Sequence, residues 1–305
     1  MRKFILSFVS FSLFIVIPGI GFEILLRNIP NDYSLKNSFL SENSDSISVI
    51  YLGSSHTYTG IDPKVSTYSG FNAAYNSQTL KYDLKILQKF SWNKLEYIVL
   101  PLSYFTLFDN LEDGIEFWRI KNYSIYYRFF TSFNPKDYSE IFSNDNSLNY
   151  KRLIDYYYHN KTSITSSELG FSIINKKTIL SENEFKEIGL NAAKRHTKKE
   201  RIHLSENLRY LDKIIEFANK RGVRILLFTP PGHDSYISNL DSEQLNFTIN
   251  KGIELSSKNQ NIKYYNLLSD NSFNADDFFN ADHLNENGAE KLTIKIDSII
   301  SSLEK

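Results

Sequence analysis

The stretch "VIYLGSSHTYTGIDP", Val49–Pro63, decides how the rest of the chain is interpreted. With the two residues before it, it contains "ISVIYLG", a mainly apolar run with β-branched residues that ends in Gly53 and is typical of a buried parallel strand. Two serines and a histidine follow that glycine directly. Functional residues of parallel α/β sheets gather at the carboxyl ends of strands, so the turn is a candidate site.

The segments after this strand alternate between strand and helix patterns. We expect further strands at "GFNAA", "LEYIVLPL", "VRILLFTPP" and "IKYYNLL". Leucines recur at helical spacing in "SQTLKYDLKILQKF" and in "LSENLRYLDKIIEFANKRG", where Gly222 suits a helix C-cap. A closing amphipathic helix is expected behind Asn285 as its N-cap. This alternation predicts a doubly wound parallel sheet with helices on both faces.

The alternation stops between Ser103 and about Glu200, where the sequence is aromatic and polar, as in "EFWRIKNYSIYYRFF". We interpret about 104–200 as a long insertion with short helices, within an α/β domain that covers 47–305. Aromatic residues make up 15% of the chain. Those of the insertion are expected mainly in the core, with a platform for sugar rings as the alternative.

The N-terminus carries Arg2 and Lys3 ahead of an uncharged, mostly apolar run from Phe4 to Phe22, which is long enough to span a bilayer. No small-residue cleavage site follows, so residues 1–28 are expected to be an uncleaved signal anchor and 29–46 a polar stalk. The positive-inside rule places Arg2 and Lys3 in the cytoplasm, although Arg27 on the far flank weakens the asymmetry. The soluble part is then extracytoplasmic.

Composition excludes several classes of function. The chain has 305 residues, 41% of them hydrophobic, which is enough for a sizeable core. Lys+Arg and Asp+Glu are both 35, so no overall positive charge favours nucleic acid, and no nucleic-acid partner is expected. The absence of cysteine excludes disulfides, thiolate metal sites and Cys nucleophiles.

A second candidate group lies near the C-terminus, in "DDFFNADHLNENGAEKLT". It places His283 in a loop before the last helix, at the sheet edge where Ser55 is expected. An early serine and a late histidine are one of the permitted orders of a Ser-His-acid site. Taken alone, Ser55 would be a helix-capping serine. Asp276, Asp277 and Asp282 cluster near His283, but their spacing fits no strong metal motif, and no metal is expected.

Together these segments resemble the SGNH/GDSL-type hydrolases, in particular a membrane-anchored branch associated with O-acylation of bacterial surface polysaccharides. The resemblance covers the whole chain and rests on the anchor followed by "YLGSSHTYTGIDP", "FNAAYNSQTLKYD", "IVLPLSYFTL", "ILLFTPPGH" and "FNADHLNENGA". It implies a flavodoxin-like three-layer sandwich. It also implies that Ser55 is the nucleophile and His283 the general base.

Several positions depart from the family pattern. The histidine-orienting aspartate is Asn280 here, so Asp282, Asp276 or Asp277 would have to supply the charge. A neutral amide holds an imidazole ring but does not stabilise imidazolium as a carboxylate does. Ser54 replaces the aspartate before the nucleophile. The remaining candidates for oxyanion or substrate contacts are His56, Asn76, Ser77 and Ser103, with Tyr104 as the alternative to Ser103.

The resemblance implies transfer or hydrolysis of an O-acyl group, most simply acetyl, on an envelope or exported polysaccharide. No cofactor is expected, and a membrane-bound acyltransferase partner could supply the acyl donor. The alternative is a catalytically degenerate glycan-binding or scaffold protein of a polysaccharide assembly system. A structural envelope protein that shares only the fold is the third interpretation, because fold does not fix function.

Overall fold

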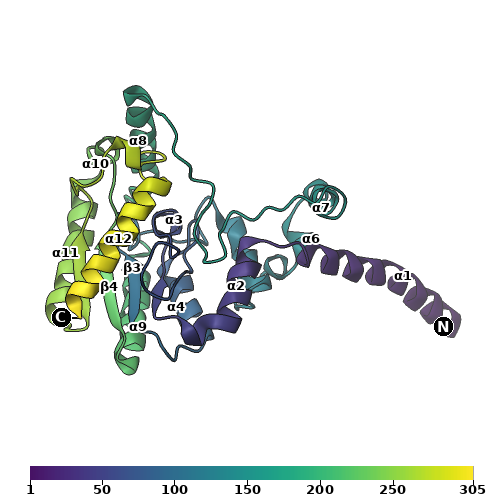
Figure 1. Ribbon diagram of the computed structural model, residues 1–305. Coiled ribbons are helices and arrows are strands. Elements are labelled where there is room, and N and C mark those ends of the chain that lie inside the picture. Colours follow the sequence, from purple (N-terminus) through teal and green to yellow (C-terminus); the bar gives the residue numbers. More distant parts are fainter. Residues whose placement is uncertain (305) are drawn as a thin grey trace. The chain divides into compact units, whose positions relative to one another are not determined.

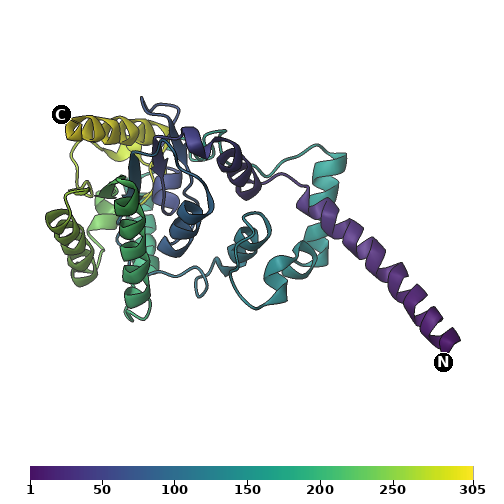
Figure 2. The same ribbon diagram turned by 90° about the horizontal axis from the view of Figure 1, so that it is seen from below.

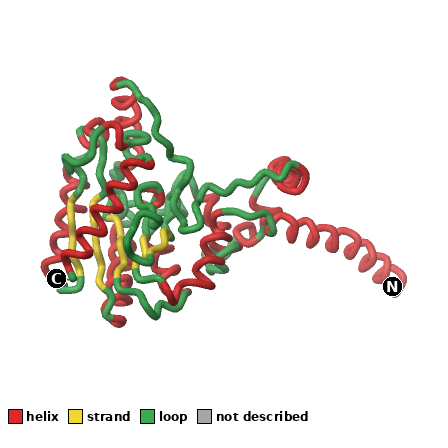
Figure 3. The backbone as a smooth tube through the Cα atoms, viewed as in Figure 1, coloured by secondary structure: helices red, strands yellow, loops and turns green. Residues whose placement is uncertain are grey.

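The computed structural model describes residues 1–304, which form two compact units. Unit 1 consists of Met1–Asn37 with Ile115–Ile164, and unit 2 of Ser38–Gly114 with the chain from Thr165 onward. Helix α2 (Asp32–Asn43) crosses the boundary between them and occupies most of the segment expected to be a stalk. Figure 3 shows that strands and helices are separated by many loops.

Unit 2 is built on a sheet of five parallel strands in the order β2-β1-β3-β4-β5. The strands are β1 (Val49–Tyr51), β2 (Gly70–Asn72), β3 (Tyr97–Pro101), β4 (Arg224–Thr229) and β5 (Ile262–Asn266). All four neighbouring pairs are parallel, and Val49 pairs with Gly70 on one side and Tyr97 on the other. This order is that of the flavodoxin-like doubly wound sheets, whose switch point lies between β1 and β3. The predicted α/β fold is therefore confirmed.

Helices cover both faces of this sheet, as Figures 1 and 2 show. The first face packs against α12 (Glu286–Leu303) and α8 (Glu182–His196), and Val99, Leu226, Leu292 and Ala192 meet in its core. The other face packs against α4 (Leu80–Lys89), α9 (Leu204–Arg221) and α11 (Ser242–Lys258). Side chains alternate across a strand, which is why a buried strand needs apolar residues at every position.

The helix ends follow local sequence signals. Gly222 ends α9 in the left-handed region at φ 68°, as a C-cap glycine does. The Asn285 side chain accepts hydrogen bonds from the backbone N–H groups of Asn287 and Gly288 and begins α12. Helix α8 begins with a capping box between Ser181 and Glu184. Short helices α3 (Ser55–Tyr58) and α10 (Asp234–Ile237) complete unit 2, together with the 3₁₀ turns η1 (Ser44–Ser46) and η5 (Ala275–Asp277).

Unit 1 is helical. It contains α1 (Arg2–Arg27), α5 (Ile120–Ile125), α6 (Glu140–Ser143), α7 (Asn146–Leu153), two 3₁₀ turns, η2 (Phe117–Arg119) and η3 (Pro135–Tyr138), and a π-helical turn, η4 (Ile154–Tyr158). Helix α1 is long and apolar enough to cross a membrane, and its most apolar window is not buried by the rest of the chain. At 1.5 Å per residue it would extend about 39 Å, more than the thickness of a hydrocarbon core.

Candidate functional site

Ser55 lies at the carboxyl end of β1, as the first residue of α3. The chain reaches it through Gly53, whose φ of +106° is in the region that favours glycine. A Cβ on Gly53 would clash with the ring of Pro101, so neighbouring β3 leaves no room for a side chain. The tight turn at Gly53 therefore places Ser55 at the switch point between β1 and β3.

His283 lies in the loop that joins η5 to α12. Its backbone carbonyl accepts a hydrogen bond from the N–H of Phe279 at 2.9 Å, and Phe278 and Leu284 form an isolated antiparallel bridge. These contacts close the loop into a compact turn. The turn brings the His283 ring to the carboxyl edge of the sheet, where Ser55 lies.

The two side chains are in contact, although 228 positions separate them in sequence. Oγ of Ser55 lies 2.8 Å from Nε2 of His283. Ser55 is the one residue between Val49 and Ile61 that is not fully buried, and His283 is the one between Ala281 and Asn285. The pair therefore faces the surface, while its neighbours belong to the packed interior.

Two oxygens face the other ring nitrogen of His283. Nδ1 lies 3.1 Å from Oδ1 of Asn280 and 3.2 Å from Oδ1 of Asp282. Oδ1 of Asn280 also accepts hydrogen bonds from the backbone N–H groups of Asp282 and His283. A carboxylate only accepts, so the proton of a neutral ring lies on Nδ1, and Nε2 is left to accept from the Ser55 hydroxyl.

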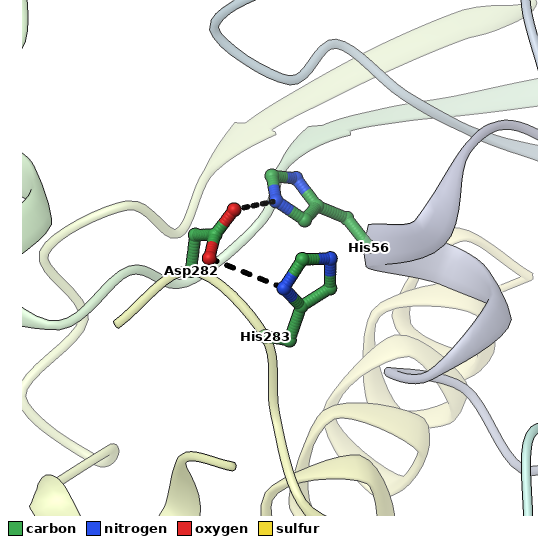
Figure 4. A group of neighbouring side chains, drawn as sticks. All are labelled: His56, Asp282 and His283. Carbon is green, nitrogen blue, oxygen red and sulfur yellow. Dashed lines mark hydrogen bonds and ion pairs between the residues drawn. The ribbon is translucent and has the colours of Figure 1, made fainter. Parts of the chain in front are cut away.

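Asp282 is almost fully buried and has further neighbours on its second oxygen (Figure 4). Oδ2 lies 3.8 Å from Nε2 of His56, 3.8 Å from Nδ1 of His196 and 3.5 Å from a guanidinium nitrogen of Arg195. The 3.8 Å separations are too long for hydrogen bonds. Among the described side chains, the Asp282 carboxylate is thus hydrogen-bonded to the His283 ring and, at the longer distance of 3.5 Å, to the guanidinium of Arg195.

The electrostatics favour an ionised Asp282 beside neutral His56 and His196 rings. Burial alone would raise the pKa of Asp282, but the charge and hydrogen bond of His283 hold that pKa well below its usual range. Burial lowers the pKa of His56 and lowers that of His196 well below the usual value. At neutral pH the two rings are therefore neutral, and Asp282 is ionised beside His283.

The other residues singled out from the sequence have varied positions. Oγ of Ser103 lies 2.9 Å from Nδ1 of His56, whereas the Tyr104 hydroxyl binds Thr197. Ser54 is buried, and its hydroxyl has no partner among the described residues. Ser54 and Ser77, the latter at φ 56°, line a cavity of about 10 Å³, enough for one water. Asn76 is half-buried in the loop before α4.

Two alternatives for the acid lie away from His283. Asp277 is buried and pairs with Nζ of Lys291 at 2.8 Å, and Asp276 pairs with Nζ of Lys177 at 3.0 Å. His233 caps α10 by accepting from the backbone N–H of Ser235 and stacks on Phe185. These three side chains therefore have structural partners of their own.

Sequence reasoning missed three members of the site. Arg195 and His196 are the last two residues of α8, inside the predicted insertion. The third is Tyr236 on α10, whose hydroxyl forms a 3.0 Å hydrogen bond with Nδ1 of His196. No spacing motif connects these residues to Asp282. The one available signal was the helical pattern of 182–196 with its capping box, which would have shown that this part of the insertion is a regular helix.

A cation is the chemical alternative to proton transfer. His56, Asp282 and His283 each offer one ligand atom, and these atoms lie within 4.8 Å of one another. Both nitrogens of His283 already face oxygen partners, and Nε2 faces Ser55. A cation bound here would have to break one of these contacts, so the arrangement suits proton transfer better. The absence of a metal stays a prediction.

No protein-family model and no curated protein matches the sequence. Solved structures with some similarity include a "putative platelet activating factor" from Streptococcus pneumonia, at 10% identity, a TM-score of 0.46 and coverage of 88% of this chain and 91% of that one. Another is a "putative acylhydrolase" from Bacteroides fragilis, at 10% identity, a TM-score of 0.41 and coverage of 89% and 95%. Similarities this distant assign neither a family nor an activity to the chain.

Proposed function

We propose that the chain is a membrane-tethered serine acyl-transfer enzyme, an esterase or O-acetyltransferase. One observation carries the proposal: the Ser55 hydroxyl lies 2.8 Å from Nε2 of His283, whose Nδ1 faces the buried carboxylate of Asp282. A hydroxyl, an imidazole and an acid in this order form an activated nucleophile. The same three roles recur on unrelated folds, so they are recognised by geometry.

The first half-reaction acylates the serine. Oγ of Ser55 attacks the ester carbonyl carbon while its proton passes to Nε2 of His283, and the carbonyl π electrons move to the oxygen. The ionised Asp282 stabilises the imidazolium that forms. Collapse of the tetrahedral intermediate breaks the ester C–O bond, and His283 returns the proton to the leaving alcohol.

The second half-reaction releases the acyl group. Water gives hydrolysis and a sugar hydroxyl gives transfer, in each case with His283 as the base that accepts the proton of the attacking group. Ser55 is the first residue of α3, so its backbone N–H has no acceptor within the helix and can donate to the oxyanion. Ser77, His56 and Ser103 remain candidates for substrate contacts.

The polysaccharide acceptor and the extracytoplasmic location are the finer parts of the proposal. They are supported by the apolar helix α1 with Arg2 and Lys3 before it, and by the motif resemblance to polysaccharide O-acylation proteins. A tethered domain can accept an acyl group from a membrane-embedded donor protein. No cofactor is needed beyond the acyl donor or water.

The test is acetyl release from p-nitrophenyl acetate by the full-length chain in detergent. Ser55→Ala and His283→Ala are each expected to lower turnover by at least about 1,000-fold, because the members of such a site act as a unit. Ser301→Ala is the matched control and should retain wild-type turnover, because Ser301 is exposed on α12. Acyl-enzyme mass on Ser55 should appear in the wild type and in the control, and be absent from Ser55→Ala.

The alternative is a glycan-binding or scaffold protein that has lost the chemistry, and the departure at Asn280 favours it. It predicts no Ser55-dependent turnover and no acyl-enzyme with either p-nitrophenyl acetate or an acetylated polysaccharide. It also predicts that Ser55→Ala binds polysaccharide as well as the wild type does. That pair of results would replace the enzyme proposal.

A further inference from the structure

The C-terminal end of α1 lies beside other helices of unit 1 (Figures 1 and 2) and is joined to them by hydrogen bonds. The Glu23 carboxylate accepts hydrogen bonds from the backbone N–H groups of Glu140 and Ile141 and from the Ser139 hydroxyl, at 2.9 to 3.0 Å. The Tyr157 hydroxyl donates to the carbonyl of Leu25 at 3.0 Å. Helix α6 and the turn η4, which continues α7, are therefore held beside the last turns of α1.

The inner side of these helices is polar. Glu140 is fully buried and accepts from Nζ of Lys121 at 2.8 Å, from Arg152 at 2.6 Å and from the Tyr126 hydroxyl at 2.6 Å. Buried Asn149 donates to the carbonyl of Glu140. Because every partner is charged or hydrogen-bonded, this network joins α5, α6 and α7 into one body.

The outer side is apolar and aromatic. Phe142 is 69% exposed, Tyr150 63% and Tyr158 78%, with Ile154 and Tyr157 also exposed. We call these five residues the aromatic surface. Tyr150, Ile154 and Tyr158 recur every four residues along α7 and η4 and so share one helical face. Asn149 and Arg152 lie on the opposite face, toward Glu140.

This distribution reverses that of a water-soluble helical protein, in which charged groups face solvent and large apolar groups face the core. Aromatic residues with polar edges are enriched where a bilayer meets water. These helices, with polar groups inside and aromatic groups outside, adjoin the end of α1. Helix α1 is the one helix among residues 1–304 that is apolar enough to span a membrane. We infer that the aromatic surface lies in the headgroup region of the bilayer that α1 spans.

The occupant of this surface is therefore lipid. Charges near it are nearly balanced: Lys151 and Lys161 are offset by Asp145 and Asp155, and Lys161 lies 3.8 Å from Asp155. Burial of aromatic area, and not attraction to anionic headgroups, would drive the contact. The inference does not depend on the proposed chemistry, and it makes 115–164 a membrane platform on whichever side of the bilayer it lies.

Because the chain has no cysteine, single-cysteine variants can report on this surface. Phe142→Cys, Tyr150→Cys and Tyr158→Cys would each be labelled with a nitroxide in the full-length chain. The chain would be reconstituted in vesicles of phosphatidylcholine, with and without phosphatidylglycerol. Ile253→Cys is the matched control, since Ile253 is 54% exposed on α11 of unit 2.

The measurement is the collision rate of each nitroxide with oxygen, which enters lipid, compared with its collision rate with a water-soluble nickel chelate. We expect the three labels of the aromatic surface to favour oxygen several-fold more than the label at Ile253, equally in both lipids. Equal nickel accessibility at all four positions would overturn the inference. Protection only in native membranes, and not in pure lipid, would also overturn it and assign the surface to a protein partner.

Discussion

Asp282 in unit 2 and Glu140 in unit 1 are both buried carboxylates surrounded by nitrogen groups, yet their contacts differ. Glu140 is directly bonded to Lys121 and Arg152, at 2.8 and 2.6 Å. Asp282 has one close ring partner, His283, and keeps its other nitrogen neighbours at 3.5 to 3.8 Å.

The pKa values follow these contacts. Burial would raise the pKa of Glu140, but the charges of Lys121 and Arg152 lower it to about 2. Its charge is thus neutralised in the resting protein. Asp282 is also ionised, but it faces a histidine that can gain a proton. A carboxylate that is fully paired with permanent cations, such as Glu140, holds helices together. A carboxylate beside an imidazole, such as Asp282, can stabilise the charge that the ring gains when it accepts a proton.

Replacing Asp282 by Asn should give the largest effect. We expect turnover of p-nitrophenyl acetate to fall by about 1,000- to 10,000-fold, because the imidazolium loses its counter-charge. Stability should change far less, since His56 and His196 are neutral and the half-exposed guanidinium of Arg195 remains solvated. The measurement is turnover together with a thermal melt. Turnover within tenfold of wild type would mean that Asn280 alone is sufficient.

Glu140→Gln should show the opposite pattern. We expect about 3 kcal/mol of destabilisation, because buried Lys121 and half-buried Arg152 lose their counter-charge. Ester turnover per folded molecule should not change. The thermal melt of the full-length chain in detergent measures the first effect, with exposed Glu187→Gln as the control. Loss of turnover in folded Glu140→Gln would mean that Glu140 also contributes to the reaction, and the distinction from Asp282 would be wrong.

Asp83 extends the comparison to a buried carboxyl that has no cation beside it among residues 1–304. It accepts from the backbone N–H of Gly53 at 2.9 Å and from Gln78 at 2.7 Å, and burial raises its pKa to about 7. The unfolded chain ionises this group at lower pH, so stability is lost as pH rises from about 4 to about 7. Asp83→Asn should keep both hydrogen bonds and remove this loss.

The measurement is urea unfolding at pH 5 and pH 8, followed by the fluorescence of buried Trp92 in a Trp118→Phe background. Asp83→Asn should reduce the stability difference between the two pH values by about 2 kcal/mol. Exposed Asp212→Asn is the control and should leave the difference unchanged. An unchanged difference in Asp83→Asn would mean that Asp83 is ionised in the folded protein.

Asn280→Ala should give the smallest effect. It removes one of the two oxygens on Nδ1 of His283 and two hydrogen bonds within the loop, but it leaves the Asp282 carboxylate. We expect kcat to fall by about tenfold with little change in KM, because ring orientation and not substrate binding is affected. Steady-state kinetics beside exposed Asn287→Ala provide the check. A fall in kcat as large as that of Asp282→Asn would mean that the Asn280 and Asp282 oxygens are equally important for His283.

Local patterns were sufficient for much of unit 2. The apolar runs that became β1 and β3, and the turn residues after them, predicted where Ser55 would lie. The spacing of α9 and α12, with Gly222 and Asn285 at their ends, predicted those helices. These features depend on residues close together in sequence, so one sequence carries the information.

The acid and the site's other neighbours depended on distant contacts. Asn280 and Asp282 are two residues apart, and only the closed loop before α12 turns both oxygens toward Nδ1 of His283. His196 reaches the site because α8 packs back on the sheet from within a segment that lacks the strand-helix alternation. No local sequence pattern predicts that α8 packs against the sheet.

The sequence by itself determined an apolar N-terminal helix, a parallel α/β sheet, a serine after the first strand and a histidine in the loop before the last helix. The tertiary structure alone decided that these two side chains touch, that Asp282 is the carboxylate beside them, and that 115–164 buries Glu140 while exposing aromatic rings. The physical reason is the range of the interactions. Periodicity records what each residue's immediate neighbours require, whereas burial and ion pairing depend on groups that only folding brings together.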